Sequence, residues 1–128
     1  LGYFGLAYYE QNKDRLKIVP VDDEKSGNGE GPVVPSTETV MNNTYQPLAR
    51  PIFIYVSLAA AQKDNIQKFV EFYLDNAPEL VEEVGYIPLQ KESYEAVKRR
   101  FASRIKGSVF SGGAKVGVSM AEMLKMEK

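Results

Sequence analysis

The residue types best suited to chemistry occur in this chain at spacings that complete no catalytic or metal-binding motif. Residues 107–115 (G-S-V-F-S-G-G-A-K) have the glycines of a phosphate-cradling loop. In a P-loop the last glycine directly precedes lysine, and a Ser or Thr that holds magnesium follows. Here Ala114 precedes Lys115 and Val116 follows it. We therefore interpret this stretch as a flexible turn before a last helix.

A second candidate has the opening of a calcium-binding loop. Asp22, Glu24 and Ser26 place oxygen atoms at alternate positions before Gly27. The bidentate carboxylate that closes such a loop is its twelfth residue, and that position is occupied by Val33. We expect no metal site here and interpret residues 27–31 as a solvated hairpin tip.

Local structure explains the remaining polar candidates. Ser36 has no His or Lys partner and suits a helix N-cap. The triplet at residues 42–44 (N-N-T) fits the N-glycosylation pattern, which is frequent by chance, and the pair at residues 82–83 suits a solvated helix face. A basic cluster could bind an anion or a partner, although a solvated face is the more usual role. Its members are Lys98, Arg99, Arg100 and Arg104.

Composition excludes several classes of function. The chain has 128 residues, 44% of them hydrophobic, a formal net charge of −1, and neither histidine nor cysteine. This size suits one ordinary domain, and the scattered basic residues do not indicate nucleic acid. We expect a protein that is not an enzyme, without cofactor or metal, and we assign no catalytic or ligand-binding residue in this segment. The eight tyrosines suit a cleft or an interface, but such residues more often belong to the core and its rim.

The stretch that organises the chain is residues 52–56 (I-F-I-Y-V), an unbroken β-branched and aromatic run after Pro51. It predicts a strand buried on both faces. A helix should follow from the N-cap candidates Asp64 and Asn65, with one apolar stripe and a break or kink at Pro78. The stripe consists of Ile66, Phe69, Val70, Tyr73, Leu74 and Ala77.

Shorter elements are expected on both sides of this unit. Residues 2–5 suit the end of a strand, 6–16 a helix, 16–21 an edge strand, and 22–35 a loop. Residues 36–41 suit a short capped helix and 79–84 a second short helix that Gly85 ends. Residues 91–106 suit an amphipathic helix, and a capping box at residues 119–122 suits a last short one.

The opening residues (L-G-Y-F-G) contain neither an initiator methionine nor a charged region before an apolar one. We expect the chain to be a portion of a longer protein.

Four blocks of the sequence belong together: residues 1–13 (L-G-Y-F-G-L-A-Y-Y-E-Q-N-K), 34–40 (V-P-S-T-E-T-V), 45–56 (Y-Q-P-L-A-R-P-I-F-I-Y-V) and 69–89 (F-V-E-F-Y-L-D-N-A-P-E-L-V-E-E-V-G-Y-I-P-L). In this order they resemble the C-terminal portion of the phosphate-binding protein of bacterial phosphate ABC transporters. The resemblance extends from residue 1 to about residue 105. Its specific parts are G-Y-F-G, T-Y-x-P-L-x-R-P and V-G-Y-x-P-L, in this order.

The resemblance implies a type II periplasmic binding protein of class α/β, in which two three-layer α/β/α lobes with mixed sheets close over phosphate. Residues 1–45 would complete the second lobe, 46–57 would form the crossover and central strand, and 58–128 would supply helices of the first lobe and a C-terminal extension. The implied function is extracytoplasmic capture of phosphate and its delivery to an ABC permease. The implied location is the periplasm or outer surface, with membrane anchoring left open.

The phosphate ligands of this family lie upstream, including an S-G-T helix start that is absent here; Ser111-Gly112-Gly113 is the nearest string and stands in the tail. No ligand residue is therefore carried over. Because the portion would complete neither lobe, we expect it to pack with the rest of the protein or with a second copy. Two alternatives stay open: a binding protein for another oxyanion such as sulfate or molybdate, and a small non-enzymatic α/β interaction domain.

Overall fold

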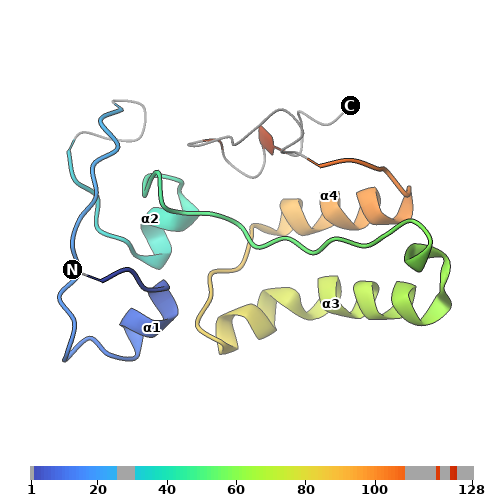
Figure 1. Cartoon of the computed structure of the whole chain (residues 1–128), viewed down its shortest axis with the longest axis horizontal. Helices are drawn as coiled ribbons and strands as arrows, with labels where there is room; N and C mark the ends of the chain where they lie inside the picture. The colour runs from blue at the N-terminus through green and yellow to red at the C-terminus, as the bar shows by residue number, and fades with distance from the viewer. Residues whose placement is uncertain (1, 26–30, 109–117, 119–121, 124–128) are drawn as a thin grey trace. The chain divides into compact units, whose positions relative to one another are not determined.

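A computed structural model describes residues 2–25, 31–108, 118 and 122–123 (Figure 1). The chain divides into two compact units. Unit 1 comprises Leu1–Ala49 and Glu79–Pro88, and unit 2 comprises Arg50–Pro78 and Leu89–Lys128. The last helix expected from the sequence, at residues 119–122, lies largely outside the described residues.

Helix α1 of unit 1 spans Leu6–Glu10, which is shorter than the predicted helix over residues 6–16. The Asn12 side chain donates a hydrogen bond to the Tyr8 carbonyl at 2.8 Å, in place of a backbone donor in the next turn. Residues 11–15 continue as turns, in which the Asn12 carbonyl accepts the N–H groups of Arg15 and Leu16. The predicted helix was too long because an asparagine side chain competes for the hydrogen bonds of the backbone, which disfavours continuation of the helix.

An isolated antiparallel bridge joins Val21 to Val33 in unit 1, with N···O distances of 2.9 and 2.8 Å. The expected strand over residues 16–21 is otherwise absent, because a single bridge leaves the residues before Pro20 without a neighbouring strand. The bridge closes the base of the loop whose tip was expected to be a hairpin turn. That tip lies largely outside the described residues.

Helix α2 spans Thr37–Met41 and confirms the predicted capped helix. The Ser36 hydroxyl accepts the N–H of Thr39 at 3.1 Å, and the Thr39 hydroxyl accepts the N–H of Ser36 at 2.9 Å. This reciprocal capping box satisfies two backbone donors that a helix start otherwise leaves without partners.

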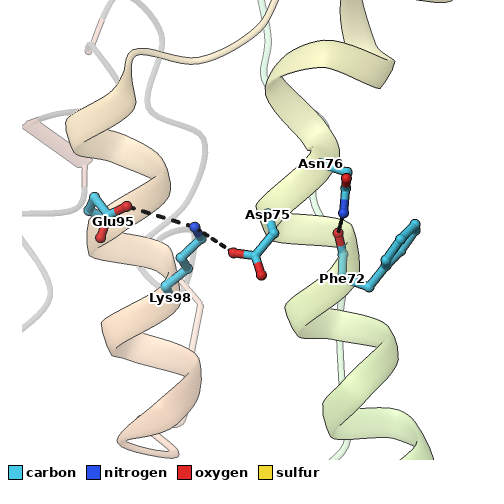
Figure 2. A network of polar contacts seen from close by, with 5 residues as sticks. All are labelled: Phe72, Asp75, Asn76, Glu95 and Lys98. Carbon is cyan, nitrogen blue, oxygen red and sulfur yellow. Dashed lines mark hydrogen bonds and ion pairs between the residues drawn. The ribbon is translucent and has the colours of Figure 1, made fainter.

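Helix α3 spans Asp64–Glu83 without the predicted break, and Pro78 lies inside it. A proline removes one backbone hydrogen bond of the helix and crowds the preceding turn. The Asn76 side chain donates to the Phe72 carbonyl at 2.7 Å in that turn (Figure 2), which gives the weakened region a further hydrogen bond. The boundary between the two units falls directly after Pro78.

A left-handed glycine ends helix α3, as the sequence predicts. Gly85 has φ of 76°, its N–H donates to the Glu82 carbonyl, and the N–H of Tyr86 donates to the Val81 carbonyl. The second of these bonds is that of a Schellman motif, which satisfies a carbonyl at the helix end.

In unit 2, helices α3 and α4 lie side by side, and the extended chain before α3 runs beside them (Figure 1). Helix α4 spans Lys91–Ala102 and buries Ser93 and Tyr94. Between α3 and the extended chain, a short 3₁₀ helix spans Ala60–Gln62 and buries Ala61.

The apolar stripe predicted for α3 is confirmed only in part. Val70, Leu74 and Ala77 are buried, but Phe69 is 61% exposed. Phe69 lies on the edge of the stripe, and helix α4 covers only one side of α3, so the ring is largely uncovered by the described residues of unit 2.

The buried strand predicted over residues 52–56 is not formed in the structure of this chain. These residues form no β-ladder, and Ile52 and Tyr55 are 69% and 75% exposed. A strand needs a neighbouring strand for its N–H and C=O groups, and the described residues provide none beside this stretch. The α/β lobe predicted from the sequence therefore stays a prediction.

Candidate functional site

Two arginines of the basic cluster bind carbonyls at and just beyond the C-terminus of helix α4. The Arg104 guanidinium donates to the Phe101 carbonyl at 2.6 Å and lies 4.7 Å from the centre of the Phe101 ring. Arg100 donates to the carbonyls of Lys106 and Gly107 at 3.4 and 3.3 Å. Cations near the last carbonyls of a helix are favoured by the helix dipole. For these two arginines, the geometry favours a role in holding the chain at the end of α4 over a role in binding an anion.

Lys98 joins the two long helices of unit 2 (Figure 2). Its ammonium group lies 2.7 Å from a carboxylate oxygen of Asp75 on α3 and 3.7 Å from one of Glu95 on α4. The hydrogen bond to Asp75 is the main cause that raises the pKa of Lys98, and burial opposes it. The Lys98 side chain remains about a third exposed, so solvent screens the pair and its contribution to stability is small.

The sequon at residues 42–44 forms a compact turn after α2. The Asn42 side-chain oxygen accepts the hydroxyl of Thr44 at 2.6 Å and its N–H at 3.1 Å. Gln46 is buried, and its amide donates to the Asn43 side-chain oxygen at 2.8 Å. The polar side chains of this triplet are thus used to fold the loop.

In the segment that resembles the start of a calcium-binding loop, carboxylates accept hydrogen bonds from the backbone of the same turn. Asp22 accepts the N–H of Glu24 at 2.8 Å, and Asp23 accepts the N–H of Lys25 at 3.2 Å. No group of acidic side chains suited to a metal ion occurs among the described residues. Ser26 and most of the P-loop-like stretch at residues 107–115 lie outside them.

The tyrosines expected at a cleft or interface divide between exposed and half-buried positions. Tyr3, Tyr8 and Tyr55 are exposed, and the Tyr8 ring stacks on Phe4 with centroids 5.1 Å apart. Tyr45 is half-buried, and burial is the main cause that raises its pKa, with a smaller contribution from Tyr3. The geometry of these rings suits contact with another protein surface rather than catalysis.

Exposed apolar side chains of unit 2 show where the chain leaves apolar surface uncovered, which sequence reasoning expected but did not assign to particular residues. Ile52, Ile54, Tyr55 and Leu58 of the extended chain are exposed, as are Phe69 and Phe72 of α3. Figure 2 shows Phe72 on the side of α3 away from α4. The signal was present in the sequence, because apolar residues at positions 69 and 72 make the apolar face of α3 wider than one neighbouring helix can cover. We call these six side chains the apolar set of unit 2.

No helix among the described residues is long and apolar enough to cross a membrane.

Comparison with known proteins relates nearly the whole chain to larger proteins. The chain is 49% identical over 127 residues to the protein SphX of Synechococcus elongatus, a match that covers 99% of this chain and 36% of SphX. It is 47% identical over 129 residues to SphX of Synechocystis, covering 99% of this chain and 37% of that protein. The phosphate-binding protein PstS of Staphylococcus aureus is 40% identical over 98 residues, covering 75% of this chain and 28% of PstS.

The chain therefore spans little more than a third of the length of the SphX proteins that it matches. No family model matches it, and no solved structure matches it significantly. The similarity to SphX and PstS supports a phosphate-binding protein family for this chain.

Proposed function

We propose that this chain is part of the extracytoplasmic phosphate-binding component of an ABC transporter, a non-enzymatic protein that captures phosphate between two lobes and delivers it to a permease. The observation that carries the proposal is the identity of 49% with SphX over 99% of the chain, together with 40% identity to a protein named for phosphate binding. Membrane anchoring of the complete protein is compatible with this role.

In this proposal the chain is the C-terminal portion of the protein and acts as scaffold. The division into two units, with one boundary between Ala49 and Arg50, supports a chain that passes from one lobe to the other. The proposed crossover at residues 46–57 contains that boundary. Residues 52–56 become the central strand of the first lobe once a sheet is present beside them.

The phosphate contacts come from residues outside this chain. Three cations of the basic cluster already have partners within the described residues: Arg104 binds the Phe101 carbonyl, Arg100 the Lys106 and Gly107 carbonyls, and Lys98 the Asp75 carboxylate. A buried anion is typically held by helix N-termini, hydroxyls and an arginine, and those groups would belong to the remainder of the protein.

A chimaeric protein tests the proposal. This chain replaces the matched region of SphX from Synechococcus elongatus, and calorimetric titration compares phosphate with sulfate, with native SphX as the reference. We expect the chimaera to bind phosphate with an affinity close to that of the reference, and the 128-residue chain alone to bind none. A folded chimaera that binds no phosphate would refute the proposal, and one that prefers sulfate would assign a different oxyanion.

A further inference from the structure

We propose that the C-terminal end of helix α4 docks on an anionic lipid surface through a basic patch. The patch consists of Arg99, Arg100, Arg104 and Lys106. The proposal rests on the proposed function only in that it places the complete protein beside the membrane that holds a permease. It adds a surface of this chain and the chemistry of the partner that this surface fits.

The first support is the separation of charge along the chain. Residues 96–108 contain five Lys or Arg and no Asp or Glu, whereas the whole chain has 16 Lys or Arg and 17 Asp or Glu. The rest of the chain therefore has 11 cations against 17 acidic residues, a formal charge of −6. Lys98 is left out of the patch because the Asp75 carboxylate offsets its charge. Positive charge gathered at one end of one helix, in an otherwise acidic chain, favours the binding of an anionic surface.

The second support is the turn that gathers these cations. The N–H of Ile105 donates to the Arg100 carbonyl at 3.2 Å, and the N–H of Arg104 donates to the Phe101 carbonyl at 3.1 Å, as in a Schellman motif. The Arg100 guanidinium donates to the Lys106 carbonyl at 3.4 Å, which holds Lys106 beside the last turn of α4. Hydrogen bonds to neutral carbonyls leave the charge of an arginine in place. Both arginines that hold the turn therefore still contribute to the positive field.

The third support is the backbone of Arg104. It follows the C-cap Ser103 and has φ of 55°, a left-handed conformation in which glycine is favoured because it has no Cβ. A glycine would end the helix without this strain, but it would bring no charge. Strained residues are concentrated at functional sites, and here the strain places a cation inside the patch.

The exposed side chains of the patch define its occupant. Arg99 and Lys106 are exposed, and Ile105 between the cations is 55% exposed. Within the part of the chain that the structure describes, no ion pair joins Arg99, Arg104 or Lys106 to a carboxylate. Exposed cations beside an aliphatic side chain suit lipid headgroups, because the cations contact phosphates while the aliphatic group reaches the acyl boundary.

Vesicle sedimentation tests the docking on the SphX chimaera, in which the rest of the protein is present. The probes are vesicles of phosphatidylcholine alone and vesicles of equal parts phosphatidylcholine and phosphatidylglycerol. We expect the chimaera to sediment with the anionic vesicles only. The double substitution Arg99→Gln and Lys106→Gln should weaken this binding by about 20-fold, because each cation near an anionic surface contributes about fivefold. The matched control is Arg15→Gln with Lys17→Gln, which removes the same charge from exposed residues of unit 1 and should leave the binding unchanged.

Equal losses in the two double variants would overturn the proposal, as would a folded chimaera that does not sediment with the anionic vesicles. Retention on a polyglutamate resin without binding to vesicles would assign an acidic protein surface in place of lipid. Release from the vesicles by phosphate, but not by chloride of equal ionic strength, would assign free phosphate to the patch. Phosphate calorimetry on the same chimaera separates the two proposals. Phosphate binding without vesicle binding refutes only this docking, and vesicle binding without phosphate binding refutes only the function.

Discussion

At the scale of single residues, several polar side chains among the described residues bind the backbone of their own element or of the adjoining turn. Asn12 and Asn76 each donate to the carbonyl four residues earlier, at 2.8 and 2.7 Å. Asp22 accepts a backbone N–H two residues later, and Arg104 closes the end of α4. Side chains used in this way stabilise turns and helix ends, and they are then less available to a ligand.

Tyr45 provides a pH-dependent test of the environment in unit 1. Burial raises its pKa above the ordinary 10.0, with a smaller effect from Tyr3. The unfolded chain therefore loses this proton at lower pH than the folded chain does. The stabilisation is complete below pH 10.0 and is lost as the pH rises through the folded-state pKa.

We expect the free energy of unfolding, measured with urea from pH 8 to 11, to fall less steeply above pH 10 in Tyr45→Phe than in the wild type. Tyr55→Phe is the control, because the Tyr55 ring is exposed. An unchanged slope in Tyr45→Phe would show that the Tyr45 hydroxyl is not buried as described.

At the scale of elements, the sequence predicts those that are determined by neighbouring residues. Helix α2 and the glycine end of α3 follow from Ser36 and Gly85, whose effects act within one turn, whereas Asp64, predicted as an N-cap, is the first residue of α3 itself. The early end of α1 at Glu10 and the passage of α3 through Pro78 were not predicted. At the end of α1 the Asn12 side chain donates to the Tyr8 carbonyl, and such geometry is not visible in the hydrophobic pattern.

The glycine that ends α3 has a left-handed backbone and also lies close to α1. Substitutions can separate the cost of backbone strain from the cost of a clash with α1. Gly85 has φ of 76°, and a Cβ atom added there would lie 3.1 Å from the Cβ of Ala7 on α1. Gly31 has φ of 78° with nothing within 4 Å of an added Cβ, so it has the same backbone requirement without the contact.

We expect Gly31→Ala to lower the free energy of unfolding by about 1 kcal/mol through backbone strain alone. Gly85→Ala should cost about 2–3 kcal/mol, because α1 must also move away. Urea unfolding monitored by far-ultraviolet circular dichroism measures both. Equal losses in the two variants would mean that α1 does not pack against the end of α3.

At the scale of the whole molecule, the apolar residues exceed the surface that the chain can bury. The run at residues 52–56 predicts a central strand, and its composition still favours one. Yet a strand is defined by partners distant in sequence, which the described residues do not supply. The sequence therefore indicates the stretch but not its neighbours in space, and the strand expected there stays a prediction. The absence of a ligand site was argued from resemblance, and local hydrogen bonding of the polar candidates is compatible with it.

The exposed apolar set leads to a last prediction about the isolated chain. A dye that fluoresces on apolar surfaces should bind the 128-residue chain roughly several-fold more strongly than it binds the SphX chimaera, because the chimaera covers the side chains that the chain exposes. In the isolated chain, the double substitution Phe69→Gln and Phe72→Gln should reduce the fluorescence while the far-ultraviolet spectrum stays unchanged, since both rings are 61% exposed and contribute little to the fold. Glu71→Gln, between them on the polar side, should change neither signal. If the double variant kept the full fluorescence, the dye would be bound elsewhere, and the apolar set would not be the surface that the chain leaves uncovered.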